Sequence, residues 1–148
     1  MSIKILRAVC AAALLTAVGS PALAQSDSHY APGPLWYVTA VHVEDGQFEN
    51  YMDFLADKFK KEHEFGIKEG VELSYHVLSV NQKRAGEPDL YLVFTTKDYL
   101  TTAQQLAFEA KLNAMLREDR RTGEASGAKR APMRKILGNM ELQELTLK

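Results

Sequence analysis

Apolar residues recur along the chain with two different spacings, and the change between them predicts the first two elements. Residues 35–43 read Leu-Trp-Tyr-Val-Thr-Ala-Val-His-Val, a β-branched and aromatic run typical of a strand, and Glu44-Asp45-Gly46 ends it as a turn. Residues 48–67 carry apolar side chains three or four positions apart, which is the spacing of an amphipathic helix. We expect that helix to end at Gly66 or Gly70.

The rest of the chain predicts three more strands and one more helix. Residues 72–80 alternate as a strand, and residues 81–89 form a hairpin loop into a third strand at 90–95. Thr96-Lys97-Asp98 supply cap residues for a helix that ends near Arg121. Residues 122–132 are predicted as a loop, and residues 134–147 as a strand bent at Gly138. This order predicts an α+β, ferredoxin-like βαββαβ fold, with two helices on one face of a four-stranded antiparallel sheet.

Both faces of the first strand are mainly apolar, whereas a half-exposed antiparallel strand alternates apolar with polar residues. One set of alternating residues comprises Leu35, Tyr37, Thr39, Val41 and Val43. The other set comprises Trp36, Val38, Ala40 and His42, and the last strand adds Ile136, Met140 and Leu142. A sheet that is apolar on both faces needs a second cover, which a symmetric copy can supply. We therefore predict a homodimer.

Two junctions resemble those of the dimeric α+β barrel superfamily. The strand that runs into Val43-Glu44-Asp45-Gly46 is similar to the superfamily's opening of valine, two polar residues, glycine and helix. The passage Val-Phe-Thr-Thr-Lys-Asp at 93–98 is similar to its aromatic-x-Ser/Thr junction before the second helix. The resemblance covers residues 35–147 and extends to NIPSNAP-like, EthD-like and antibiotic-biosynthesis-monooxygenase-like domains. It implies a dimeric α+β barrel with a small cavity between the sheet and the helices of each protomer. It also implies that Val41 and Thr39 point toward the helices, and that the set with Trp36 and His42 faces the barrel side.

The same resemblance implies no single activity. The superfamily includes cofactor-free monooxygenases, haem-handling enzymes and stress-response proteins. This chain lacks a distinctive Asn-Trp-His pattern, which argues against the monooxygenase activity. A haem would need an axial ligand, which His42, His63 or His76 could supply, and the sequence selects none of them. The cofactor is therefore left undefined.

The first 24 residues have the order of a secretory signal peptide. Lys4 and Arg7 precede an apolar run at 8–18, and small residues occupy the −3 and −1 positions of a cleavage site after residue 24. That run reaches only about 16 Å as a helix, against a hydrocarbon core of about 30 Å. We predict a signal peptide at 1–24, a flexible leader at 25–34 and one domain at 35–148. The mature protein would be periplasmic or secreted, without a membrane segment and without Cys10, the single cysteine.

Composition and charge narrow the function classes. The chain is 46% hydrophobic and 25% charged, with a formal net charge of −1, so we expect no nucleic-acid partner. Residues 117–135 differ, because they hold seven basic and three acidic side chains. Two interpretations stay open. The basic residues form a local anion site, or they are cations that interact favourably with the macrodipole at a helix C-terminus.

The candidate chemistry lies on the predicted strands. His42 and His76 are the candidate catalytic residues, because they could approach across the sheet and imidazole exchanges protons near neutral pH. Trp36, Tyr75 and Tyr91 are the candidate ligand-binding residues, and Tyr37 is a further aromatic pocket candidate, because a flat apolar molecule stacks on such rings. All six also fit an interpretation as ordinary packing residues with satisfied hydrogen bonds.

His63, within Lys-Lys-Glu-His-Glu at 60–64, is expected at a solvated helix end. No metal site is predicted, since two histidines lack a third ligand at a fixed spacing. The leading functional hypothesis is an exported homodimer that binds or transforms a small apolar or aromatic molecule in a pocket on the sheet. Whether it is an enzyme stays open. The alternative is a non-catalytic interaction protein whose apolar face serves self-association alone.

Overall fold

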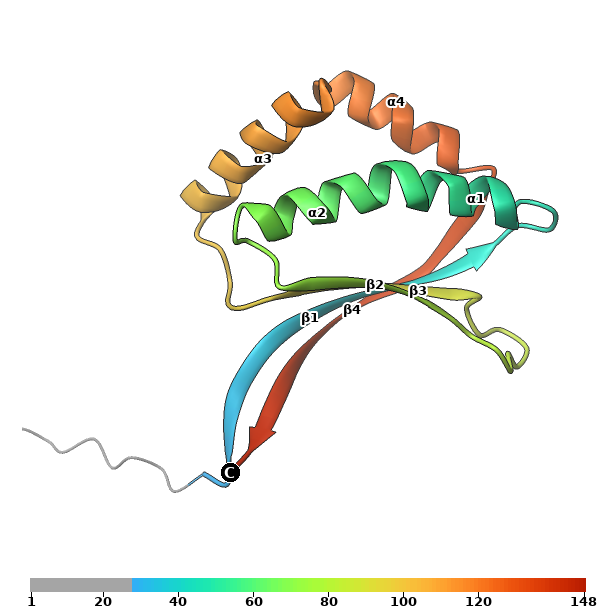
Figure 1. Cartoon of the computed structure of the whole chain (residues 1–148). Coiled ribbons are helices and arrows are strands. Elements are labelled where there is room, and N and C mark those ends of the chain that lie inside the picture. The colour runs from blue at the N-terminus through green and yellow to red at the C-terminus, as the bar shows by residue number, and fades with distance from the viewer. Residues whose placement is uncertain (1–27) are drawn as a thin grey trace, which may run out of the picture.

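The computed structural model describes residues 28–148, so the expected signal peptide and the first residues of the expected leader lie outside the described residues. Nine elements follow one another in this part of the chain (Figure 1). They are β1 (Tyr30–Val43), α1 (Phe48–Phe54), the π-helical turn η1 (Leu55–Phe59), α2 (Lys60–Lys68), β2 (Ser74–Ser79), β3 (Leu90–Thr96), α3 (Thr102–Leu116), α4 (Arg120–Arg130) and β4 (Arg134–Leu147).

The four strands form one antiparallel sheet in the order β2-β3-β1-β4, with all the helices on one side (Figure 1). This order and the helix placement are those of the predicted ferredoxin-like α+β fold, which is confirmed. Among the described residues, no helix combines the length and the apolar character that a membrane span requires.

One continuous helical segment, made of α1, η1 and α2, covers the sheet. Its buried face presents Tyr51 and Leu55, one turn apart, to Val41 of β1 and Leu90 of β3. The spacing of three and four residues read from the sequence is therefore the spacing that builds the core. The helix ends before Gly70, which adopts the left-handed backbone conformation (φ 72°) that favours glycine.

The sequence prediction of the second helix was wrong in two respects. Thr96 still belongs to β3, and the N-cap is Thr101, whose hydroxyl accepts a hydrogen bond from the backbone N–H of Gln104. The predicted loop at 122–132 is largely the helix α4, which Asp119 caps through the backbone N–H of Thr122. Neither α3 nor α4 buries a residue, so α4 has no apolar face from which its helical spacing could be recognised.

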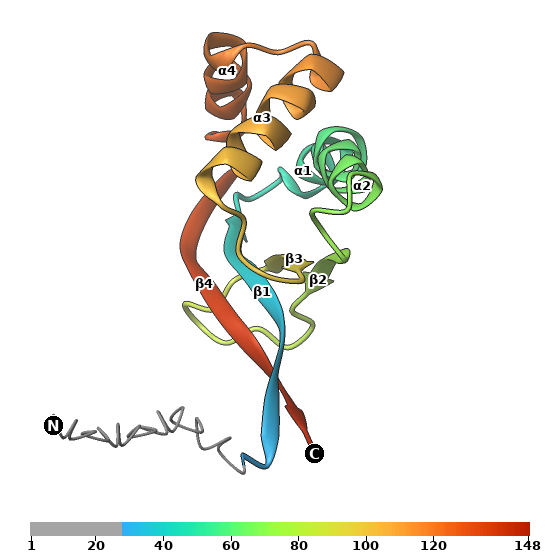
Figure 2. The ribbon, with the colours of Figure 1, turned by 90° about the vertical axis from the view of Figure 1, so that its left-hand side faces the viewer.

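The first strand is longer than the predicted one at its N-terminal end, whereas the last strand has the predicted bounds. β1 begins at Tyr30, inside the expected leader, and Tyr30 pairs with Leu147 of β4. Together the two strands extend beyond the body of the protein (Figure 2). The register of β4 shifts beside Gly138, because Ala40 pairs with Gly138 while Val41 pairs with Ile136. This bulge agrees with the bend expected at Gly138.

The predicted assignment of the two sheet faces is also correct. Leu35, Val41 and Val43 are buried on the helix side, so the alternate set that includes Trp36 faces away from the helices. On this outer face, two β4 residues remain half exposed, Met140 at 45% and Leu142 at 50%. A single protomer therefore leaves apolar side chains uncovered on the side opposite the helices.

Candidate functional site

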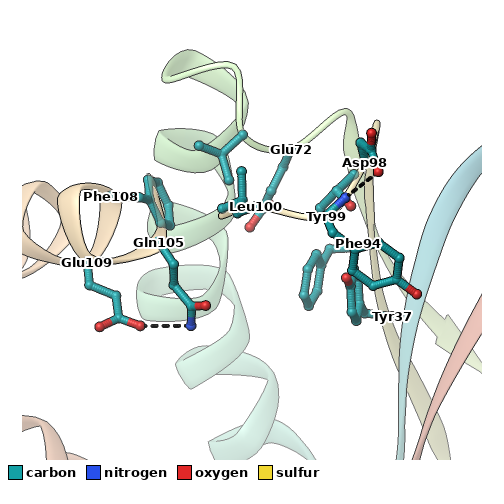
Figure 3. Close-up of a pocket in the computed structure, with 11 residues that line it drawn as sticks. Tyr37, Glu72, Phe94, Asp98, Tyr99, Leu100, Gln105, Phe108 and Glu109 are labelled. Atoms are coloured by element: carbon teal, nitrogen blue, oxygen red, sulfur yellow. Dashed lines mark hydrogen bonds between the residues drawn. The ribbon is translucent and has the colours of Figure 1, made fainter. Parts of the chain in front are cut away.

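A cavity of about 370 Å³ lies between the helix side of the sheet and α3 (Figure 3). The strands supply one wall, α3 supplies the opposite wall, and the chain around residues 71–72 and 98–100 supplies the ends. Its lining residues are Tyr37, Val71, Glu72, Phe94, Thr96, Asp98, Tyr99, Leu100, Gln105, Phe108 and Glu109. The cavity thus lies between the sheet and α3.

Aromatic rings form both long walls of this cavity. Tyr37 and Phe94 are direct partners across β1 and β3, and their rings stack with centroids 4.7 Å apart and planes 13° apart. On the other wall, Phe108 of α3 lies against Phe65 of α2 at 5.9 Å. Rings held in place by neighbouring rings make a preformed apolar surface onto which a flat molecule can stack.

Thr96 places an unsatisfied polar group in this apolar wall. The residue is only 6% exposed, and its Oγ1 has no hydrogen-bond partner among the described residues. A buried hydroxyl without a partner is unfavourable and is found for a small minority of buried polar groups. The adjacent Thr95 points to the other face, where its Oγ1 lies 2.8 Å from the Ser74 hydroxyl. The protein therefore supplies a hydrogen-bond partner for the hydroxyl of Thr95 but, among the described residues, none for that of Thr96.

A buried histidine–carboxylate pair stands at one end of the cavity. His63 Nδ1 lies 2.7 Å from Glu72 Oε2, and the two side chains are only 11% and 8% exposed. The imidazole is enclosed by the rings of Phe59 (4.2 Å), Tyr75 (5.6 Å) and Phe94 (5.1 Å). Glu72 itself lines the cavity, so the pair connects the cavity wall to the helix above it.

The expectation that His63 sits at a solvated helix end was wrong. His63 follows Phe59 by four residues, so both side chains lie on the face of the helix that packs over β2 and β3. The charged neighbours at 60–62 and 64 concealed this position in the sequence. The four-residue spacing from Tyr51 through Leu55 and Phe59 was the signal that could have revealed it.

Gly66 leaves the space that Glu72 occupies. A Cβ atom at residue 66 would lie 2.6 Å from Glu72 Cδ. The carbonyl oxygen of Gly66 also accepts hydrogen bonds from the backbone N–H groups of Val71 (3.0 Å) and Glu72 (3.1 Å). The end of α2 therefore both turns the chain and fits the carboxylate against His63.

Tyr99 ties the loop before α3 to the last strand. Its hydroxyl donates a hydrogen bond to Glu141 of β4, while its ring remains largely exposed at the cavity. This hydrogen bond raises the pKa of Tyr99, with smaller contributions from burial and from the charge of Glu141. Tyr99 thus remains a neutral hydroxyl and closes one side of the cavity between β1 and α3.

The two predicted catalytic histidines do not meet. His76 pairs with Val93, and Val93 pairs with Val38, four residues before His42 in β1. At about 3.3 Å per residue, the two histidines are separated by about 13 Å along the strands alone. His42 instead pairs with Asp89, whose Oδ2 lies 2.8 Å from its Nδ1.

The predicted ligand-binding residues lie on both faces of the sheet. Trp36 is on the outer face, where its indole N–H donates to Glu144 at 2.9 Å, and Tyr91 shares that face. Tyr75 is on the helix side and packs beside His63 at the back of the cavity wall. Of the sequence candidates, Tyr37 lines the cavity, and the two histidines and the other three aromatic residues do not.

Asp89 is the acceptor for three groups at the end of β1. Lys83 donates to its Oδ1 (2.6 Å), and the Val43 N–H (2.9 Å) and His42 share its Oδ2. Burial raises the pKa of Asp89, but these hydrogen bonds and the charge of Lys83 outweigh it, so that the pKa falls below its ordinary value. The cluster is a fixed ionised carboxylate rather than a proton donor.

The substitution Asp89→Asn is expected to flatten the loss of stability in acid. A carboxyl whose folded-state pKa is depressed stabilises the protein above its unfolded-state pKa of about 3.9, and that stability is lost as the pH falls through the lower folded-state value. Urea unfolding from neutral to strongly acidic pH should therefore decline more steeply below about pH 4 in the wild type. Asp53→Asn, at an exposed position of α1, is the matched control. Parallel curves for wild type and Asp89→Asn would contradict the expectation.

In the part of the chain that the structure describes, no three or more His, Cys, Asp or Glu side chains gather as a metal-binding group would. The paired histidines each contact a single carboxylate, His42 with Asp89 and His63 with Glu72. The two pairs are therefore arranged as hydrogen-bonded dyads.

No protein-family model and no curated protein sequence matches the chain. Among solved structures, it is similar to a NIPSNAP family protein of unknown function from Agrobacterium tumefaciens, with 12% identity over 81% of this chain and 94% of that one (TM-score 0.44). It is also similar to a dimeric ferredoxin-like protein of unknown function from Thermobifida fusca, with 14% identity over 78% of this chain and 92% of that one (TM-score 0.40). It is similar as well to a dimeric ferredoxin-like protein from an uncultured marine organism, with 16% identity over 80% of this chain and 98% of that one (TM-score 0.42).

Proposed function

We propose that the protein binds a small, largely apolar or aromatic molecule in the cavity between β1, β3 and α3. The observation that carries this proposal is the Thr96 hydroxyl, which is buried in an aromatic wall and has no partner among the described residues. A ligand that stacks on Tyr37 and Phe94 would satisfy it after a rotation of the Thr96 side chain that turns the hydroxyl into the cavity. A volume of about 370 Å³ suits a molecule of one or two fused rings.

An enzymatic form of this function would use Glu72. The carboxylate lines the cavity and can accept a proton from a bound molecule, while His63 holds it in place from behind. His63 is then a positioning residue, because Glu72 separates it from the ligand. In this proposal the pocket lies on the helix side of the sheet, and His42 and His76 are not among its lining residues.

We infer that a second copy of the chain covers the outer face of the sheet, and that residues 1–24 direct export. Leu78, Met140 and Leu142 are exposed on that face, and their apolar area would be buried between two sheets. The competing function, self-association without a ligand, rests on this same surface. The cavity and the outer face lie on opposite sides of the sheet, so they can be tested separately.

Thr96→Val is expected to stabilise the unliganded protein by about 1 kcal/mol, because it removes a buried hydroxyl that has no partner and keeps the side-chain shape. Thr95→Val is the matched control on the adjacent residue. It should destabilise the protein by about 1 kcal/mol, because it leaves the Ser74 hydroxyl without its partner. Denaturant unfolding of both variants measures the two changes in the free energy of unfolding, which should have opposite signs.

The same pair of variants tests ligand binding. Naphthol, which offers two fused rings and one hydroxyl, serves as the fluorescent probe. We expect saturable binding to the wild type and to Thr95→Val, and affinity about tenfold weaker for Thr96→Val after loss of one hydrogen bond. Native mass spectrometry of the purified protein should in addition detect a retained small molecule. Absence of saturable naphthol binding together with no retained molecule would reject the proposal in favour of self-association alone.

A further inference from the structure

Two arginines flank a second, smaller cavity where α4 passes into β4. Arg130 is the last residue of α4 and Arg134 is the first residue of β4, and both line a hollow of about 210 Å³ together with Gly127, Ala131 and Ile136. The hollow shares no lining residue with the cavity beside α3. It lies within the basic segment 117–135 for which two interpretations were open.

Neither guanidinium has a counter-ion within the described residues. Arg84 and Arg120 both lie within ion-pair distance of a glutamate, whereas Arg130 and Arg134 take part in no ion pair. The Nε atoms of Arg130 and Arg134 are buried and have no hydrogen-bond partner there. A buried N–H donor without an acceptor is unfavourable, and a bound group that accepts from the guanidinium would offset this cost.

Aromatic rings hold the two guanidinium groups beside each other. Arg130 Cζ lies 4.7 Å from the centroid of the Phe54 ring, and Arg134 Cζ lies 5.6 Å from that of Tyr51. Tyr51 and Phe54 are themselves stacked at 6.0 Å in the core-facing helix. Each guanidinium group is therefore packed against an aromatic ring of α1.

The macrodipole of α4 accounts for only part of the basic segment. Lys129 and Arg130 lie in the last turn of α4, where cations are favourable, and Lys129 is solvent-exposed as that explanation requires. Arg134 lies beyond the helix, in a strand, and is partly buried. The positive charge of Arg130 acts to lower the pKa of Glu62, but the ion-pair partner of Glu62 is Lys58, at 3.8 Å. The macrodipole of α4 therefore does not explain the position of Arg134.

We propose that this hollow binds a phosphate-type oxyanion between Arg130 and Arg134. Two guanidinium groups present paired N–H donors in a fixed fork that matches the oxygens of a phosphate group, and their two positive charges match a dianion. Tyr51, whose ring lies under Arg134, is not among the residues that line the hollow, so the donors for the anion are those of the two arginines.

Calorimetric titration of the whole protein with inorganic phosphate, at constant ionic strength in chloride, tests the proposal. We expect saturable binding of one phosphate per chain and a rise in melting temperature with phosphate concentration. Arg134→Met should weaken binding by about tenfold or more, while Lys129→Met, an exposed cation one residue from Arg130, should leave it unchanged. Arg134→Lys keeps the charge but removes the fork, and should weaken binding while the circular dichroism stays native.

A second titration with glycerol phosphate distinguishes the source of the group. Tighter binding of the ester than of inorganic phosphate would assign the hollow to a phosphorylated small molecule, and the reverse would assign it to the free ion. Absence of saturable binding by both compounds, or affinities that Arg134→Met and Lys129→Met reduce equally, would overturn the proposal. These titrations leave the Thr96 cavity untouched, so either proposal can fail alone.

Discussion

Met140→Lys is expected to convert a self-associated protein into a monomer. Met140 pairs with Val38 on the outer face of the sheet and is 45% exposed in a single protomer. If a second copy covers this face, the substitution places an unpaired ammonium group at the centre of the interface, and twofold symmetry does so twice. We expect the dissociation constant to rise by about a thousandfold or more, which corresponds to about 4 kcal/mol.

Sedimentation velocity over a range of concentrations measures this shift. Ala125→Lys, which adds the same charge at an exposed position of α4 on the helix side, is the matched control and should leave the association unchanged. A wild-type protein that is monomeric at all concentrations would contradict the inferred dimer. So would a Met140→Lys variant that associates as well as the control.

Gly66→Ala is expected to destabilise the protein by about 1–3 kcal/mol, although alanine is the better helix former. The added Cβ would lie 2.6 Å from Glu72 Cδ, and Glu72 cannot swing away without breaking its contact with His63. The overlap therefore outweighs the gain of about 1 kcal/mol that alanine brings to a helix interior.

Gly123→Ala is expected to change the free energy of unfolding in the opposite direction. Gly123 lies in α4, and the nearest atom to a Cβ added there is 3.9 Å away, in the Glu118 side chain. This variant should gain about 0.5–1 kcal/mol, since only the helix propensity changes. Urea unfolding of both variants checks the pair, and a stabilised Gly66→Ala would show that Glu72 is free to move.

The strands and the first helix were predictable because their signals are local. Alternation at residues 35–43 places Val41 toward the helices, and the four-residue spacing of Tyr51 and Leu55 supplies the face that meets it. The order of these elements then leaves few antiparallel sheets to choose from. The helix α4 was missed because its residues are polar on every side and its formation depends on the Asp119–Thr122 cap.

The cavity was not predictable, because its parts come from distant positions. Tyr37 and Phe94 become partners only through the register of β1 and β3, and Phe108 reaches them only through the placement of α3. Composition drew attention to the outer-face residues His42 and Trp36 instead. The unsatisfied state of Thr96 is a property of the packed protein, and no single-residue pattern reports it.

The absence of buried residues in α3 has a consequence for how the cavity is entered. Since α3 contributes no side chain to the core, it can detach from the sheet while Tyr51, Leu55 and Leu90 stay packed. Subglobal openings of this kind require less free energy than global unfolding, and they expose amides to hydrogen exchange early. The amides of α3 should therefore exchange sooner than those of β3, and a bound molecule that bridges both walls should slow them selectively.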